Sequence, residues 1–195
     1  MKLGCVLMAA GISRRFGGDK LLKPFRGVPL YQLALAAIPG EAFSTVAVVS
    51  GTDEILSAGE KLGFVPILNR KPEEGASLTI RLGLEALKER GVEAAMFLVA
   101  DQPLLTRESV KKEIAFFLEE PGLLAAMGHE ERRGNPALFP GKYFSELLSL
   151  EGDQGGSVVL RRHSGQVRLY QIQNPMELFD VDTAEEFEEL ETGKS

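Results

Sequence analysis

Apolar runs and segments with helical periodicity alternate along the first half of the chain. Residues 3–8 form an uninterrupted apolar run, and residues 94–99 form another. Short runs of this kind, bounded by turn residues, are typical of strands that are buried on both faces. The whole pattern predicts strands at residues 3–8, 45–49, 64–68 and 94–99, and helices at residues 30–37, 54–62 and 77–88.

Strands that alternate with helices predict a parallel sheet that is covered by helices on both faces. We therefore expect an α/β protein with three layers, α/β/α, and a Rossmann-like, mostly parallel mixed sheet. Ligands of such sheets bind beyond the carboxyl ends of the strands. The loop at residues 9–20 and the turn at Asp101 each follow such an end, so we expect them to meet at one edge.

The second half of the chain has a less regular pattern. It predicts helices at residues 110–117, 141–148, 157–162 and 184–190, and strands at residues 123–127, 136–139 and 167–172. We expect a turn at Gly128, between the first two of these strands, because glycine is favoured in tight turns. No repeat or linker divides the sequence, so residues 1–195 are expected to form a single domain.

Composition narrows the classes of function. The net charge is −6, whereas a nucleic-acid binder needs a basic surface, so no nucleic-acid partner is expected. No segment reaches the roughly 20 apolar residues of a membrane helix, and the first apolar run ends too early for a signal peptide. A cytoplasmic protein without a membrane partner is therefore expected. Cys5 is the single cysteine and lies in an apolar run, which favours a buried, unreactive side chain.

The loop that follows the first strand carries the clearest chemical pattern. Residues 7–20 contain three glycines together with Arg14, Arg15 and Lys20. Small residues let backbone N–H groups approach an anion, and glycine permits the positive φ that curls a loop around it. An arginine grips phosphate oxygens with its planar fork, and a lysine adds a compact charge. The loop is therefore predicted to bind a polyphosphate.

Three other loop motifs do not fit these residues. The P-loop requires Ser or Thr after its lysine, and here Leu21 follows Lys20. The dinucleotide fingerprint requires glycine two positions after Gly11, where Ser13 stands. The nucleophile elbow requires glycine where Arg15 stands. A basic loop exposed to water would explain the arginines, but not the small residues that cluster before them.

The same loop resembles the nucleotide-binding signature of the MobA-like NTP transferases, Leu-x-Ala-Ala-Gly-x-Ser-x-Arg-x-Gly followed by Lys. The residues that match are Leu7, Ala9, Ala10, Gly11, Ser13, Arg15, Gly17 and Lys20. The resemblance implies a nucleotidyltransferase fold. It also implies that the backbone of Ala9, Ala10 and Gly11 surrounds the base and ribose, while Arg15 and Lys20 bind the triphosphate and take part in catalysis.

Two later segments extend this resemblance. Gly75 and Ser77 lie in a turn before a helix that resembles the second nucleotide-binding element of the family. An ordinary helix cap at Ser77 stays open as an alternative. Asp101 ends a buried strand in the sequence Asp-Gln-Pro, where the family holds its catalytic metal, and a carboxylate there is a good ligand for Mg²⁺. The alternative for Asp101 is that it caps the following helix.

A second metal ligand is implied near the C-terminal end. Asp180 and Asp182 belong to a segment, Asp-Val-Asp-Thr, that resembles a late family motif. Alternate residues of an extended segment share a face, so both acids can point inward. We expect Asp182 to bind the metal with support from Asp180, and a role of Asp182 or Thr183 as the cap of the last helix stays open.

The acceptor side is implied by two short resemblances. Residues 132–139 and 152–156 are similar to segments of the branch that transfers a cytidylyl group to molybdopterin. Arg133 and Asn135 are the expected contacts to an acceptor phosphate. The Ala-Ala-Gly form of the first loop and Gln102 also resemble the cytidylyltransferases.

Together these resemblances imply transfer of CMP from CTP to molybdenum-bound molybdopterin, with Mg²⁺, or Mn²⁺ instead, as the metal. Pyrophosphate is released and the cytosine dinucleotide cofactor is formed. One alternative is a different NTP, or a different phosphorylated acceptor such as methylerythritol phosphate or phospholactate. Another alternative is a non-catalytic nucleotide-binding protein that serves a molybdenum hydroxylase through transient contact.

Overall fold

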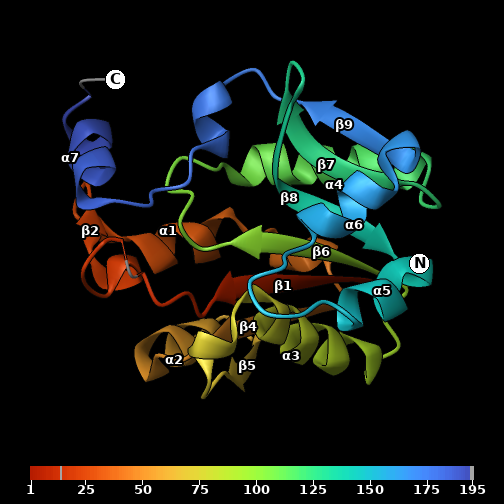
Figure 1. The fold of residues 1–195 in the computed structure, drawn as a ribbon, viewed down its shortest axis with the longest axis horizontal. Coiled ribbons are helices and arrows are strands. Elements are labelled where there is room, and N and C mark those ends of the chain that lie inside the picture. The colour runs from red at the N-terminus through yellow and green to blue at the C-terminus, as the bar shows by residue number, and fades with distance from the viewer. Residues whose placement is uncertain (14, 194–195) are drawn as a thin grey trace.

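The computed structural model describes residues 1–13 and 15–193, and a seven-stranded sheet forms its centre (Figure 1). The strands lie in the order β5-β4-β1-β6-β8-β7-β9. Their bounds are β1 Leu3–Ala9, β4 Thr45–Ser50, β5 Val65–Leu68, β6 Ala94–Val99, β7 Leu124–His129, β8 Arg132–Pro140 and β9 Val167–Gln171. Strand β8 runs antiparallel to both of its neighbours, and the other pairs are parallel. The expected mostly parallel mixed sheet is confirmed.

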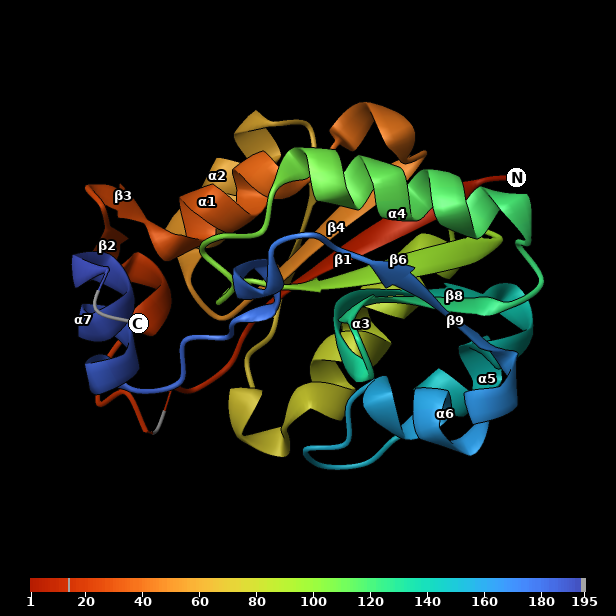
Figure 2. The same cartoon turned by 90° about the horizontal axis from the view of Figure 1, so that it is seen from above.

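Helices cover both faces of this sheet (Figure 2). Helices α1, α2 and α4 lie on one face, and α3, α5 and α6 lie on the other. Helix α7 packs beside the short hairpin of β2 and β3. The helix bounds are α1 Leu30–Ala37, α2 Asp53–Lys61, α3 Ala76–Lys88, α4 Arg107–Glu119, α5 Phe144–Leu148, α6 Ser157–Arg162 and α7 Ala184–Thr192. The three-layer architecture is therefore as predicted.

The uninterrupted apolar strands fill both cores at once. In β1, Cys5 and Leu7 belong to the core under α1, α2 and α4, while Val6 belongs to the core under α3. Alternate residues of a strand point to opposite faces, so a central strand needs apolar residues at every position. Burial raises the pKa of the Cys5 thiol far above its ordinary value, as expected for a buried side chain that fills space.

One local expectation is wrong. Gly128 lies inside β7, and the turn of the β7–β8 hairpin is at residues 130–131. A Cβ atom at Gly128 would lie 3.0 Å from the carbonyl oxygen of Arg132, so this glycine permits close approach of the strands. The helical segment expected at residues 141–148 is present, as the 3₁₀ turn Gly141–Tyr143 followed by α5.

The short hairpin near the first loop was not predicted. It pairs β2, Pro24–Phe25, with β3, Val28–Pro29. Phe25 in this hairpin contacts Phe187 of α7 edge to face, with ring centroids 5.9 Å apart.

Within residues 1–13 and 15–193, no helix has the length and apolar composition that crossing a membrane requires.

Candidate active site

A cavity of about 350 Å³ opens at the carboxyl ends of β1 and β6. Ala10 directly follows β1, and Ala100 and Asp101 directly follow β6. The cavity lining also includes Gly11, Ile12, Ser13, Arg15, Lys20, Glu73, Gly75, Thr79, Asp153 and Asp182. The glycine-rich loop and the Asp101 turn thus meet at one edge of the sheet, as their positions after parallel strands predict.

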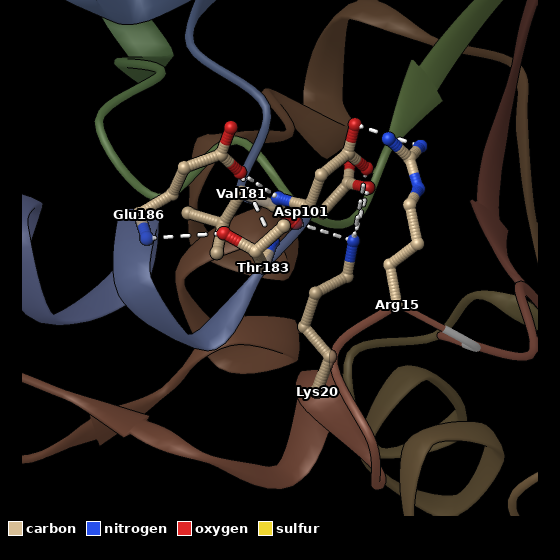
Figure 3. A network of polar contacts seen from close by, with 7 residues as sticks. Arg15, Lys20, Asp101, Val181, Thr183 and Glu186 are labelled. Carbon is tan, nitrogen blue, oxygen red and sulfur yellow. Dashed lines mark hydrogen bonds and ion pairs between the residues drawn. The ribbon is translucent and has the colours of Figure 1, made fainter.

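Lys20 is the buried cation of this cavity, and only 6% of the residue is exposed. Its ammonium donates a hydrogen bond to Asp101 Oδ2 at 2.8 Å and another to the carbonyl oxygen of Val181 (Figure 3). Asp182 Oδ1 lies 3.9 Å from the same nitrogen. A buried ammonium is stable only when it is paired, and residues distant in sequence provide this pairing.

Arg15 is the exposed cation of the same loop. Its guanidinium lies 3.0 Å from Asp182 Oδ2, and 73% of its side chain is exposed. Exposed ion pairs contribute about 0–1 kcal/mol, so this guanidinium is free to move to an incoming anion. Arg14, its neighbour in the predicted phosphate loop, lies outside the described residues.

Asp101 has one carboxylate oxygen that remains available. Oδ2 accepts the bond from Lys20, whereas Oδ1 is buried and has no hydrogen-bond partner within the described part of the chain. An unpaired buried oxygen is costly, and a carboxylate oxygen suits a hard divalent cation. Asp101 does not cap the following helix, because Thr106 caps α4 by accepting from the Ser109 N–H. The residues present therefore fit a metal at this position.

The segment before α7 brings the second carboxylate into the cavity. The N–H of Val181 donates to the carbonyl oxygen of Asp101 at 3.0 Å. Thr183 caps α7 and forms a capping box with Glu186 (Figure 3). The alternative in which Thr183 is the cap is confirmed, and this cap leaves the carboxylate of Asp182 facing Lys20 and Arg15.

Asp180 adds negative charge beside these two acids. Burial of its carboxylate, then the charges of Asp101 and Asp182, raise the pKa of Asp180 to about 6. Lys20 and the Gln102 amide offset this pKa shift in part, although that buried amide has no partner at hydrogen-bonding distance within the described residues. Burial is the first cause of this pKa shift, although the Asp180 residue as a whole is exposed to water.

The turn before α3 lies where it was expected, but Ser77 does not cap the helix. Gly75 is the cap residue, with a φ of 90° that favours glycine, and it lines the cavity. Ser77 is 3% exposed, and its N–H donates to the carbonyl oxygen of Gly152 at 3.0 Å. Ser77 is not among the residues that line the cavity.

The loop at residues 152–156 reaches this same turn. A Cβ atom at Gly75 would lie 2.4 Å from the Gly152 carbonyl oxygen and 2.6 Å from Asp153 Oδ1. Asp153 therefore lies against the turn that precedes α3. Arg133 instead donates to the carbonyl oxygen of Leu160 at 3.2 Å, and neither Arg133 nor Asn135 lines the cavity.

Sequence reasoning missed several residues that line the cavity. Thr79 follows the predicted turn by one helical turn, and Glu73 precedes it by two residues. Periodicity gives the signal for Thr79, since residues at the start of α3 share a face with that turn. Asp153 was expected only within an acceptor-side loop, and no local pattern places it against Gly75.

The loop with its basic side chains and the carboxylates paired with them has the groups that suit a phosphorylated ligand and a divalent cation, as in enzymes that act on nucleoside triphosphates. Residues 5–167 match the MobA-like NTP transferase domain. The chain belongs to this family, and it is a nucleotidyltransferase by that membership.

The chain is also similar to individual proteins. The chain is 27% identical to the purine catabolism protein PucB of Bacillus subtilis strain 168, over 94% of this chain and 93% of that protein. It is 31% identical to the molybdenum cofactor guanylyltransferase of Rhodobacter capsulatus, over 57% of each chain.

A solved structure shows the same fold. Rv0371c of Mycobacterium tuberculosis H37Rv superimposes with a TM-score of 0.83 at 22% identity, and the match covers 98% of both chains. The same protein has also been solved in complex with manganese.

Proposed function

We propose that the protein transfers CMP from CTP to the phosphate of molybdenum-bound molybdopterin, which releases pyrophosphate and forms the cytosine dinucleotide cofactor. The observation that carries this proposal is the meeting of Lys20 with Asp101 and Asp182 in one cavity. The family supports the reaction class, and the identity of the base and the acceptor is the part that we add.

In this proposal Asp101 and Asp182 would hold Mg²⁺, or Mn²⁺ instead, which would neutralise charge on the phosphates. Lys20 and Arg15 leave their carboxylate partners and bind the triphosphate. The acceptor phosphate oxygen attacks the α-phosphorus of CTP, and the bond to the leaving pyrophosphate breaks. A phosphate is already ionised at neutral pH, so the site needs no general base.

The choice of CTP rests on the first loop. The Ala9-Ala10-Gly11 form, of which Ala10 and Gly11 line the cavity and Ala9 does not, resembles the cytidylyltransferases, as does Gln102 after the metal ligand. The molybdenum cofactor guanylyltransferase relative supports a molybdopterin acceptor and leaves GTP as the competing nucleotide. Arg133 and Asn135 remain the proposed acceptor contacts, and transient contact with a molybdenum hydroxylase would deliver the product.

Pyrophosphate release tests this proposal. The purified protein is incubated with Mg²⁺, molybdenum-bound molybdopterin and each NTP in turn, and we expect pyrophosphate with CTP. Asp53→Asn changes an exposed carboxylate in α2 and should leave the rate unchanged, whereas Asp101→Asn should abolish it. Pyrophosphate with GTP alone would contradict the choice of CTP. Tight CTP binding without any pyrophosphate would favour the non-catalytic accessory role.

A further inference from the structure

The carboxylates assigned to the metal are already paired with cations of the protein itself. We infer that Lys20 competes with the divalent metal for Asp101 and Asp182, and that it releases them only when a triphosphate binds its ammonium. The protein would therefore take up the metal as a metal–nucleotide complex rather than before the nucleotide. This inference rests on the proposed function of the same site.

The position of the Lys20 ammonium supports this competition. It lies 2.8 Å from Asp101 Oδ2 and 3.9 Å from Asp182 Oδ1, and it also bonds to the carbonyl oxygen of Val181 (Figure 3). Only 8% of the Lys20 side chain is exposed, so water does little to screen its charge. A cation that contacted both acids would come close to this ammonium, and two such charges repel each other strongly where water is scarce.

The small number of carboxylates available to a metal also indicates that the metal binds together with the nucleotide. Among residues 1–13 and 15–193, no group of three or more His, Cys, Asp or Glu side chains is arranged to hold a metal. Mg²⁺ is commonly held by one or two carboxylates together with the phosphates of its substrate. Asp101 and Asp182 therefore provide only part of a metal site, and phosphate oxygens would complete it.

A triphosphate resolves the competition because it offers Lys20 new partners. The four-carbon stem of lysine lets the ammonium move toward phosphate oxygens, which frees Asp101 Oδ2 beside the unpaired Oδ1. Arg15 can make the same exchange from Asp182 Oδ2. Lys20 should consequently oppose metal binding without nucleotide and support it with nucleotide. This reversal of sign separates competition from a purely structural role.

The opposition of Lys20 to metal binding is tested by measuring Mn²⁺ binding without nucleotide, with electron paramagnetic resonance as the readout. Lys20→Met should bind Mn²⁺ at least about tenfold more tightly than the unchanged protein. Arg15→Met should tighten binding only about twofold, because its charge is largely exposed. Lys61→Met removes an equal charge from the exposed end of α2 and should leave Mn²⁺ binding unchanged.

The support that Lys20 gives to metal binding when nucleotide is bound is tested by the same measurement, with CTP present and the acceptor omitted. There Lys20→Met should bind Mn²⁺ at least about tenfold more weakly than the unchanged protein, since one phosphate partner is lost. A thermal melt followed by circular dichroism checks that the variant folds, and Lys20→Gln replaces it if it does not. The inference would be overturned if, without nucleotide, the Lys20 variant bound Mn²⁺ no more tightly than Lys61→Met does.

Failure of this inference is distinguishable from failure of the proposed function. The arm without nucleotide involves neither CTP nor turnover, so tighter Mn²⁺ binding by Lys20→Met supports the competition even if no pyrophosphate is formed. Normal pyrophosphate release by the unchanged protein, together with unchanged Mn²⁺ binding in Lys20→Met, would instead leave the transferase in place and end the competition.

Discussion

Two buried regions of the molecule hold ionisable side chains in opposite ways. At the cavity, Lys20 is paired with Asp101 and with the Val181 carbonyl oxygen. Between α4 and β7, Glu113 is fully buried, and neither of its carboxylate oxygens has a hydrogen-bond partner in the part of the chain that the structure describes. The first region keeps its charges through pairing, whereas the second favours a neutral acid.

This difference shows where in the fold a charged side chain can contribute to function. Burial raises the pKa of Glu113 well above its ordinary value. The nearby Met127 backbone N–H opposes that shift only in part, and it makes no hydrogen bond to the carboxylate. A paired charge at the cavity can be exchanged for a substrate group, but an unpaired acid in the core can only cost stability. Removing charge should therefore damage function in the first region and improve stability in the second.

The largest expected effect is at Asp101. Asp101→Ala removes the carboxylate assigned to the metal, and pyrophosphate release should fall by at least about 10³. Steady-state turnover at saturating Mg²⁺ measures this loss, with Asp53→Asn as the exposed control. Turnover within a few-fold of the unchanged protein would remove Asp101 from the mechanism.

Lys20 should come next. Lys20→Ala removes one electrostatic stabiliser of the leaving phosphates, and the rate should fall by about 10²–10³. The comparison with Lys61→Ala at saturating nucleotide separates this loss from a general change of charge. A rate similar to that of Lys61→Ala would show that the ammonium serves only to balance Asp101.

Removing the charge of Glu113 should have the opposite effect and should increase the stability of the folded protein. Because its pKa is raised in the folded protein, the unfolded chain ionises first as the pH rises above about 4, and stability falls from there. Glu113→Gln cannot ionise, so at pH 8 it should be more stable by about 1–2 kcal/mol, with a smaller gain at pH 4. Thermal melts at both pH values test this, and Glu89→Gln on the surface is the control. An equal or lower stability at pH 8 would contradict the comparison.

The smallest expected effect concerns Asp180. With a pKa of about 6 in the folded protein, its carboxylate loses its charge as the pH falls through that value. Mn²⁺ affinity without nucleotide should therefore weaken, by about threefold from this one partly exposed group. In Asp180→Asn, the Mn²⁺ affinity should change less with pH near pH 6. An unchanged profile would exclude Asp180 from the field around the metal.

The regular elements could be predicted because their patterns are local. Helix α1 has the predicted bounds, since Pro29 precedes it and Pro39 closely follows it. Strands β1 and β6 could be predicted because central strands are apolar at every position. The hairpin of β2 and β3 has only two residues in each strand, which is too short for any periodicity to appear.

The site could be predicted only in part. Lys20 and Asp101 follow parallel strands, so topology alone brings them to one edge of the sheet. The contact of Asp153 with Gly75 depends on how α3 packs against a distant loop, and no local pattern carries that information. Glutamate side chains normally lie exposed to water, but Glu113 lies on the apolar face of α4 with Val110 and Phe117, and its burial follows from the packing of α4 against β7.

The central claim is that a cationic loop and two distant acids bind one nucleoside triphosphate together with its metal. Anomalous diffraction from crystals grown with Mn²⁺ and CTP tests this directly. We predict a manganese peak at coordination distance from Asp101 and Asp182, with the Lys20 ammonium bonded to a phosphate oxygen. A peak away from both carboxylates, or Lys20 still bonded to Asp101 beside a bound triphosphate, would contradict the account.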